Sequence, residues 1–373
     1  VLLMKYHTGK NMTTMDKASG TIADFYESSD GKYIAARVNG DDDAGIDFFE
    51  KNGSRLGYFS MMEHGYANPQ KCAFLDSGRL FVVDTEGNAI TIDPLTLSDE
   101  KIEINVQSIF DMHNSYITSD NKYAVLYSLD EIAAIDLSNC TVLGDWYMKA
   151  DNITDAIITA DGGKLYYITA NDGLGCINMS DSSINNIDTA DIPIICHGAY
   201  NNIIAVSNDG SLLAISCQDG FVRIVDSSNM AVKREIAFSG LIRAYMRFSS
   251  DDSKLVLQGD DYYIHIYDVS SGEKLYSSDG QYYSIDEICD NQNGTFSIGT
   301  TNGVIVFDSS EMIPIAYVDR GKMYTSDNKV LIANTSGGYI FPFQTIQSLR
   351  EDAKDQFGNA TLSEEKRVKY HIN

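Results

Sequence analysis

Two short motifs recur along the whole chain at a nearly constant interval. The first is a polar turn ahead of an apolar run, found at residues 29–32, 76–78, 119–122, 161–163, 209–210, 251–253, 292–294 and 326–329. The second is an apolar residue followed by an acid or amide, namely Glu50, Asp93, Asp136, Asn178, Asp226, Asp268 or Asp308. Successive members of the second motif are 43, 43, 42, 48, 42 and 40 residues apart. A chain with this period is expected to build one small unit many times.

The stretch 208–236 shows what one unit contains. A turn at 208–211 precedes the apolar run 212–217, and a second turn, which contains Asp219 and Gly220, precedes the alternating run 221–226. A third turn at 227–230 leads into another β-rich run at 231–236. Asp-Gly turns between short β-rich runs indicate antiparallel hairpins. Four such strands with a period of about 40–45 residues are typical of a β-propeller blade.

The ring is expected to close by pairing the two ends of the chain. Seven full units fit residues 22–65, 66–104, 105–149, 150–191, 192–240, 241–278 and 279–321. The segment 322–343 lacks a fourth strand, and residues 11–18 can supply it. We therefore predict an all-β propeller over residues 1–343, with eight blades and a closing blade built from 11–18 and 322–343. Seven blades with one unit left over is the alternative.

The period changes beyond residue 343. Ile346, Leu349, Ala353 and Phe357 are spaced 3, 4 and 4 residues apart, as on one face of an amphipathic helix. Residues 361–364 read Thr-Leu-Ser-Glu, which fits a capping box for a second short helix. The sequence thus predicts a helical tail over residues 344–373.

Composition limits the partners. The formal net charge is −25, which disfavours nucleic acid and anionic membranes and favours a basic partner. No run of 18 apolar residues occurs, so no transmembrane helix is predicted. The six cysteines form no Cys-x-x-Cys pair, and we expect free thiols in a cytoplasmic protein rather than a metal or redox motif.

The units resemble WD-repeats, whose third strand ends in Trp-Asp. Tyr267-Asp268 is the nearest match, and the acid is also kept at Asp93, Asp136, Asp226 and Asp308. No unit keeps the Gly-His pair of that family in place, and the one tryptophan, Trp146, lies off the motif. The resemblance covers nearly the whole chain and implies the fold, without the hydrogen-bond network of typical WD-repeats.

The tail also resembles a known pattern. Residues 361–367, Thr-Leu-Ser-Glu-Glu-Lys-Arg, are similar to the helical end that follows the propeller of multidomain bacterial WD-repeat proteins. That resemblance implies the recognition part of a larger bacterial signalling or effector protein. The chain starts at Val1 rather than at a methionine, and we expect a longer parent protein.

Catalytic motifs are lacking. The sequence contains no Gly-x-Ser-x-Gly, His-Glu-x-x-His or P-loop pattern. His113 and His197 lie near predicted innermost strands, but isolated histidines are more typical of structural roles. Residues 41–47 superficially resemble a calcium loop, yet the glycine is misplaced and no glutamate stands at the twelfth position. We therefore predict no catalytic residue, no metal, no cofactor and no small-molecule substrate. A propeller hydrolase or dehydrogenase with an axial pocket is the alternative.

Acidic residues gather in the loops between the second and third strands. Because these loops all lie on one side of a propeller, they predict an acidic surface for a basic protein segment. The alternative is that Asp simply suits tight turns in an acidic chain. The predicted partner-binding residues are Asp41, Asp43, Asp84, Glu86, Asp130, Asp172, Asp219, Asp260 and Asp261. The function expected from this pattern is a non-enzymatic interaction or sensing module.

Overall fold

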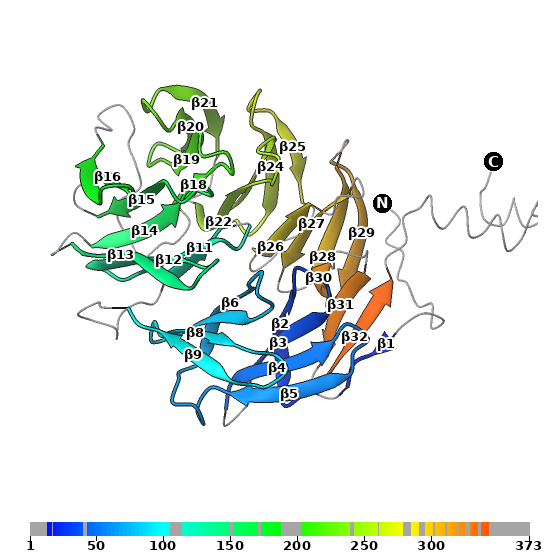
Figure 1. The fold of residues 1–373 in the computed structure, drawn as a ribbon. Coiled ribbons are helices and arrows are strands. Elements are labelled where there is room, and N and C mark those ends of the chain that lie inside the picture. Colours follow the sequence, from blue (N-terminus) through cyan, green and yellow to red (C-terminus); the bar gives the residue numbers. More distant parts are fainter. Residues whose placement is uncertain are drawn as a thin grey trace, which may run out of the picture.

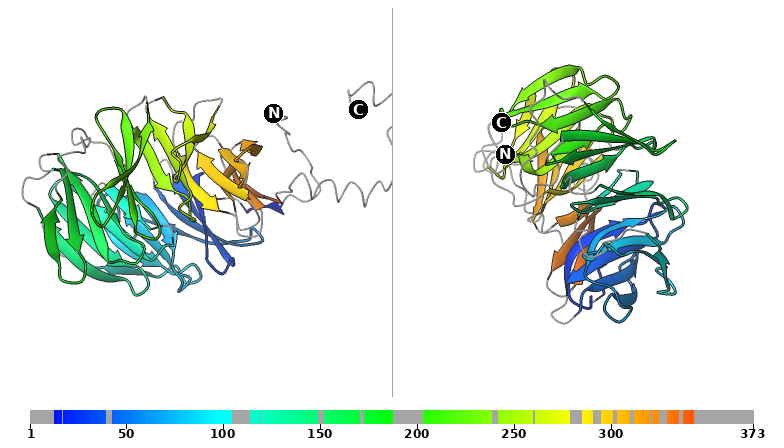
Figure 2. Two further views of the ribbon diagram at one scale, coloured as in Figure 1. Left: turned by 90° about the horizontal axis from the view of Figure 1, so that it is seen from above. Right: turned by 90° about the vertical axis from the view of Figure 1, so that its left-hand side faces the viewer.

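The computed structural model describes residues 13–16, 18–39, 43–104, 114–118, 120–148, 152–170, 173–187, 203–238, 242–259, 261–278, 285–290, 295–300, 303–309, 312–319, 321–324, 329–334 and 337–342. These residues form strands β1 to β32 and contain no helix. The strands make eight four-stranded antiparallel sheets, the blades of an all-β propeller. Figure 1 shows the sheets following one another around the molecule, and Figure 2 shows them from above and from the side.

The first four blades follow the chain order. Blade 1 contains β2 (Thr21–Glu27), β3 (Tyr33–Asn39), β4 (Gly45–Glu50) and β5 (Arg55–Ser60). Blade 2 contains β6 (Pro69–Phe74), β7 (Leu80–Asp84), β8 (Ala89–Ile92) and β9 (Asp99–Ile102). Blade 3 contains β10 (Asn114–Ile117), β11 (Tyr123–Tyr127), β12 (Glu131–Asp136) and β13 (Thr141–Tyr147). Blade 4 contains β14 (Ile153–Ile158), β15 (Lys164–Thr169), β16 (Gly173–Asn178) and β17 (Ser183–Asn186).

The remaining blades continue this order until the last one. Blade 5 contains β18 (Ile204–Val206), β19 (Leu212–Ser216), β20 (Phe221–Asp226) and β21 (Val232–Ala237). Blade 6 contains β22 (Ile242–Phe248), β23 (Lys254–Gly259), β24 (Ile264–Asp268) and β25 (Lys274–Ser277). Blade 7 contains β26 (Ile285–Asp290), β27 (Thr295–Thr300), β28 (Gly303–Asp308) and β29 (Pro314–Asp319). Blade 8 contains β30 (Gly321–Tyr324), β31 (Lys329–Asn334), β32 (Gly337–Pro342) and β1 (Thr13–Thr14).

Blade 8 joins the two ends of the chain. Thr13 lies opposite Ile340, and Thr14 lies opposite Tyr339, so β1 is the fourth strand beside β32. Met15, which follows β1, is 3% exposed and packs in a cluster with residues of blades 1 and 8. Pairing β1 with β32 removes the open strand edge that β32 would otherwise present. The predicted helical tail lies outside the described residues.

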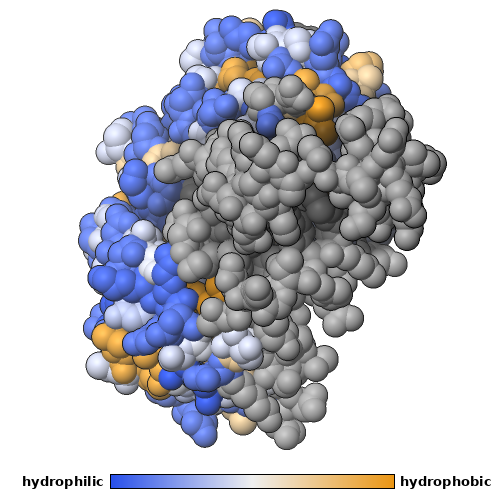
Figure 3. Space-filling view, turned by 90° about the vertical axis from the view of Figure 1, so that its right-hand side faces the viewer, coloured by the Kyte–Doolittle hydropathy of each residue, from blue (hydrophilic) through white to orange (hydrophobic). Residues whose placement is uncertain are grey.

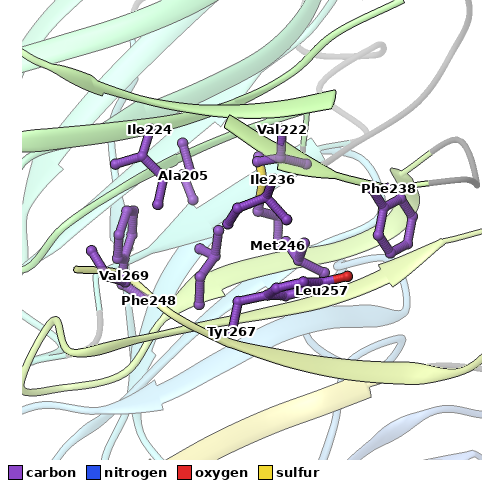
Figure 4. Close-up of a cluster of buried hydrophobic side chains, with 12 residues drawn as sticks. Ala205, Val222, Ile224, Ile236, Phe238, Met246, Phe248, Leu257, Tyr267 and Val269 are labelled. Atoms are coloured by element: carbon purple, nitrogen blue, oxygen red, sulfur yellow. The ribbon is translucent and has the colours of Figure 1, made fainter. Parts of the chain in front are cut away.

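The middle strands read as continuous apolar runs because both faces of each sheet are covered by neighbouring blades. All five residues of β7 are buried, whereas β13, an outermost strand, alternates exposed and half-buried positions. Hydrophobic clusters fill the space between successive blades. Figure 4 shows the cluster in which Val222 and Ile224 of blade 5 meet Met246 and Leu257 of blade 6. Burying each such side chain contributes roughly 1.5–3 kcal/mol.

The polar turns that define the sequence period are held by side chains. In the turn between the first and second strands, a Ser or Thr hydroxyl donates to the Asp two residues later. The pairs are Ser28–Asp30, Thr118–Asp120, Thr159–Asp161, Ser207–Asp209 and Ser249–Asp251. The acid that ends the third strand also accepts backbone N–H bonds in the next turn, as Asp93, Asp136, Asp226 and Asp268 do. The repeated acids are therefore turn residues.

Candidate functional site

One side of the propeller carries the loops between second and third strands together with the connections from one blade to the next. We call this side the loop face. It holds the described members of the predicted acidic set, which are Asp43, Asp84, Glu86, Asp130, Asp219 and Asp261. Asp41, Asp172 and Asp260 lie outside the described residues. The six described acids have different environments, which decides what each can do.

Asp84 is not available to a partner. It is 0% exposed, and its carboxylate accepts bonds from the N–H groups of Glu86 at 2.9 Å and Asn88 at 2.8 Å. It also accepts from the Asn88 amide at 2.8 Å and from Ala67 N–H at 2.9 Å, in the connection from blade 1. The prediction of a partner-binding Asp84 is therefore wrong, because burial and these four bonds use its carboxylate internally. Its effect is to fix the turn that presents the exposed Glu86.

Two further acids are bonded to side chains of their own blade. Arg223 on β20 is only 10% exposed, and its guanidinium bonds both carboxylate oxygens of Asp219 at 2.9 and 2.6 Å. Hydrogen bonds from Arg223 lower the pKa of Asp219. In blade 6, His265 Nε2 lies 3.0 Å from Asp261, and His265 Nδ1 lies 3.0 Å from the Ser277 hydroxyl. These pairs join a loop to the third and fourth strands, and the Arg223 guanidinium partly neutralises Asp219.

In blade 1, Asp43 lies beside an exposed methionine. The Tyr58 hydroxyl donates to Asp43 Oδ2 at 3.2 Å, and Met62 N–H donates to Oδ1 at 3.4 Å. Burial, followed by the charge of Asp43, raises the pKa of Tyr58, so this phenol stays a donor. The bonds hold Met62, whose side chain is 63% exposed, next to the carboxylate.

Other large apolar side chains are exposed on the loop face. In blade 3, Leu129 is 59% exposed next to Asp130, and Tyr147, at the end of β13 opposite Glu131, is 54% exposed. Tyr262 in blade 6 is 43% exposed next to Asp261. In the coloured part of Figure 3, hydrophobic residues form small patches among hydrophilic ones. The loop face thus combines acids with exposed apolar side chains.

The search against protein-family models found no match. The chain is 28% identical over 141 residues to a U3 small nucleolar RNA-associated protein 15 homolog from Xenopus laevis. That match covers 35% of this chain and 27% of the frog protein. SVP1-like protein 2 from Pichia angusta is 33% identical over 105 residues, or 27% of this chain and 29% of the yeast protein. The matches thus span less than a third of either relative.

A solved structure extends the likeness to the whole ring. The computationally designed Ika8 protein matches with a TM-score of 0.65 at 12% identity, over 88% of this chain and 98% of the designed one. At that identity the similarity shows the fold alone.

Two sequence-based expectations change in the light of these relatives. The prediction of a cytoplasmic protein is contradicted by the two frog proteins, from Xenopus laevis and Xenopus tropicalis, which are named for a nucleolar RNA. The expected bacterial, multidomain signalling context has no support, since the relatives named here come from frogs and a yeast.

A buried carboxylate that no sequence motif predicted links three blades. Asp155 follows a β-bulge in β14, the innermost strand of blade 4. It accepts a bond from Tyr127 of blade 3 at 3.1 Å, and from Ile203 and Ile204 N–H groups at the start of blade 5 at 2.7 and 3.1 Å. Burial raises the pKa of Asp155 to about 6. The signal was a charged residue inside the apolar run 153–158.

Asp24 holds the corresponding place in blade 1. It also follows a β-bulge in an innermost strand, and there it pairs with Arg37 of β3. Arg37 also donates to the Pro69 carbonyl of blade 2 at 3.4 Å. Asp155 thus connects neighbouring blades directly, and Asp24 does so through Arg37.

The described residues offer little for catalysis. His64 bonds Asp99 at 2.9 Å, and His265 is held by Asp261 and Ser277. Within the described ranges, no three His, Cys, Asp or Glu side chains gather as metal ligands. Asp47 of the calcium-like stretch is buried and bonds Arg55 at 2.6 Å, which is a structural contact. No helix in the described part of the chain is long and apolar enough to cross a membrane.

Proposed function

We propose that this chain is a non-enzymatic protein-binding propeller whose loop face binds a basic, amphipathic segment of a partner protein. The observation that carries the proposal is the pairing of exposed apolar side chains with acids on one face, as in Met62 with Asp43 and Leu129 with Asp130. Covering an exposed apolar side chain with a partner protein stabilises the complex. Neighbouring carboxylates select a partner that brings Lys or Arg.

The charge on this face supports a basic partner rather than an acidic one. The described loops between second and third strands contain acids and no Lys or Arg. Arg223, the nearest cation in blade 5, is already shared between Asp219 and Glu235. At physiological salt, the electrostatic potentials of loops that lie within about 8 Å of one another add. The partner must therefore supply the positive charge, and low salt should speed association.

The proposed contact set differs from the one expected from sequence. Glu86, Asp130 and Asp43 are the acids we assign to the partner, with Met62, Leu129 and Tyr147 as apolar contacts. Asp41, Asp172 and Asp260 belong to the set on sequence grounds. Asp219 and Asp261, which already bond Arg223 and His265, add to the negative potential of this face. Because two relatives are named for association with an RNA, a basic segment of an RNA-associated protein fits both observations.

The test compares two variants of equal charge change. The face variant combines Glu86→Gln and Asp130→Asn, and the control combines Asp76→Asn and Glu273→Gln, which are exposed in other turns. Asp30, Asp120 and Asp161 are unsuitable controls because they hold turns. The probe is a synthetic amphipathic Lys/Leu peptide, with a Lys/Ser peptide of equal charge as reference, and association is followed by stopped-flow fluorescence at several salt concentrations.

We expect the face variant to slow association and the control to leave it nearly unchanged, with the Lys/Leu peptide binding more tightly. A further variant, Met62→Ser with Leu129→Ser, should abolish the difference between the two peptides. Equal losses from the face variant and the control would overturn the proposal, since the chain would then be attracting cations by net charge alone.

A further inference from the structure

A cavity lies between blades 4 and 5, away from the loop face. Its volume is about 250 Å³, and it is lined by residues of β15, β16 and β17 on one side and by the turn after β20 on the other. The side chains that matter are Lys164, Cys176, Asn178, Asn185, Ile187 and Met230. Lys164 brings a positive charge to the wall of this cavity in a chain of net charge −25.

Two other blades have an aromatic ring at the position that Lys164 occupies in blade 4. In blades 1, 3 and 4, the first residue of the second strand donates its N–H to the Ser or Thr of the preceding turn, and these residues are Tyr33, Tyr123 and Lys164. Tyr33 packs into the hydrophobic cluster between blades 1 and 2, and Tyr123 packs into the one between blades 3 and 4. Lys164 carries no aromatic ring that could pack in this way between blades 4 and 5.

Two glycines at equivalent turns show how closely each is covered by the preceding blade. A Cβ placed on Gly162 of blade 4 would lie 2.4 Å from the ring of Tyr123, so the ring covers that turn closely. The corresponding Gly210 of blade 5 has Thr159 as its nearest neighbour, at 3.6 Å. The room that a tyrosine fills between blades 3 and 4 is therefore left open between blades 4 and 5.

Lys164 also differs from Lys254, which occupies the equivalent position in blade 6. Lys254 N–H makes the same turn bond, to Ser249. The Lys254 amine lies 3.9 Å from Asp251, and its side chain is only 15% exposed. Lys164 is exposed, and in the part of the chain that the structure describes no carboxylate oxygen lies within 4.0 Å of its amine, although the charge of Lys164 helps to lower the pKa of Asp161, three residues earlier. An exposed ammonium group on a cavity wall can bind an anion from outside.

We infer that this cavity binds a carboxylate carried on a short apolar stem. Lys164 supplies the charge, and the side-chain amides of Asn178 and Asn185 supply N–H donors for the carboxylate oxygens. Ile187 and Met230 provide apolar wall for the stem. The Tyr166 hydroxyl donates to the Ser227 carbonyl at 3.3 Å and so closes one side of the wall. The carboxylate can belong to a free small dicarboxylate or to a Glu side chain of a protein.

The test is an NMR or calorimetric titration of the whole chain with three probes, namely glutarate, a short peptide with one central Glu, and neutral glutaramide. Three variants accompany the parent protein. Lys164→Ala removes the charge and keeps the cavity. Lys164→Tyr places there the residue that blades 1 and 3 use, so it should fold and fill the cavity. Lys254→Ala changes the matched lysine that already has a carboxylate beside it.

We expect saturable binding of glutarate, of the Glu peptide, or of both, and none of glutaramide. Binding of the peptide alone identifies a protein side chain as the ligand, and glutarate binding shows that the carboxylate suffices. Lys164→Ala should weaken binding about tenfold or more, Lys164→Tyr should abolish it, and Lys254→Ala should leave it unchanged. No saturable binding of either carboxylate, equal binding of glutaramide, or equal losses at Lys164 and Lys254 would overturn the inference.

Discussion

The hydroxyl of Tyr127 on β11 donates a 3.1 Å hydrogen bond to the carboxylate of Asp155 on β14, across the boundary between blades 3 and 4. The same carboxylate accepts the backbone N–H groups of Ile203 and Ile204 at the entry to blade 5. One buried side chain therefore ties three successive blades together. Such a group links the stability of the ring to pH.

We expect stability to fall as pH rises through the titration of Asp155. Burial raises its pKa from 3.8 to about 6, so the folded chain binds this proton more tightly than the unfolded chain. This contribution is complete below about pH 4 and is lost as pH rises through about 6. It amounts to at most about 3 kcal/mol. Asp155→Asn removes the titration and keeps the shape.

The measurement is the difference in unfolding free energy between Asp155→Asn and the parent chain, taken by denaturant titration from about pH 4.5 to 7. The variant should gain relative to the parent as pH rises. A difference that stays constant over this interval would contradict the assignment.

Asp84→Ala should destabilise the fold by about 3 kcal/mol, because it leaves buried N–H donors of Glu86, Asn88 and Ala67 without an acceptor. Glu86→Ala, two residues away on the exposed tip of the same turn, should change stability by less than about 0.5 kcal/mol. Urea unfolding of the two variants separates a structural acid from a surface acid. Equal effects would mean that burial does not distinguish them.

Met15→Ala should cost about 2–4 kcal/mol, because Met15 is 3% exposed in the cluster that joins blade 8 to blade 1. Met62, which is 63% exposed, is the matched control, and its replacement by Ala should be nearly neutral. Thermal melts followed by circular dichroism provide the comparison. If Met15→Ala melts like the parent chain, the cluster at the joint between the two chain ends contributes little to closure.

Gly162→Ala should be more destabilising than Gly210→Ala by about 1 kcal/mol or more. Both glycines have positive φ, 68° and 72°, so both substitutions carry a similar backbone cost. Only at Gly162 does the new methyl group meet the Tyr123 ring, at 2.4 Å. Chemical denaturation of both variants measures the difference. The reverse order would show that the space beside Gly210 is not open, and the cavity between blades 4 and 5 would come into question.

Local chemistry in the sequence determined the repeating unit. The Asp-Gly turns, the apolar second and third runs and the interval of 40–48 residues specify four-stranded antiparallel units, because turn residues and strand-forming runs act over a few neighbours. The acids that end each third run were visible as a motif. Their use as caps of the following turn, seen at Asp93 and Asp226, needs only local contacts as well.

The tertiary structure alone decided which acids are free and where the surface is open. Asp84 and Glu86 stand two residues apart in one turn, yet one is buried by Ala67 from the preceding connection and the other faces water. Lys164 and Lys254 occupy the same place in their blades, but Lys164 is exposed, whereas the side chain of Lys254 is only 15% exposed. Such differences depend on what the neighbouring blade brings to the boundary, and a sequence pattern that repeats in every unit cannot encode them.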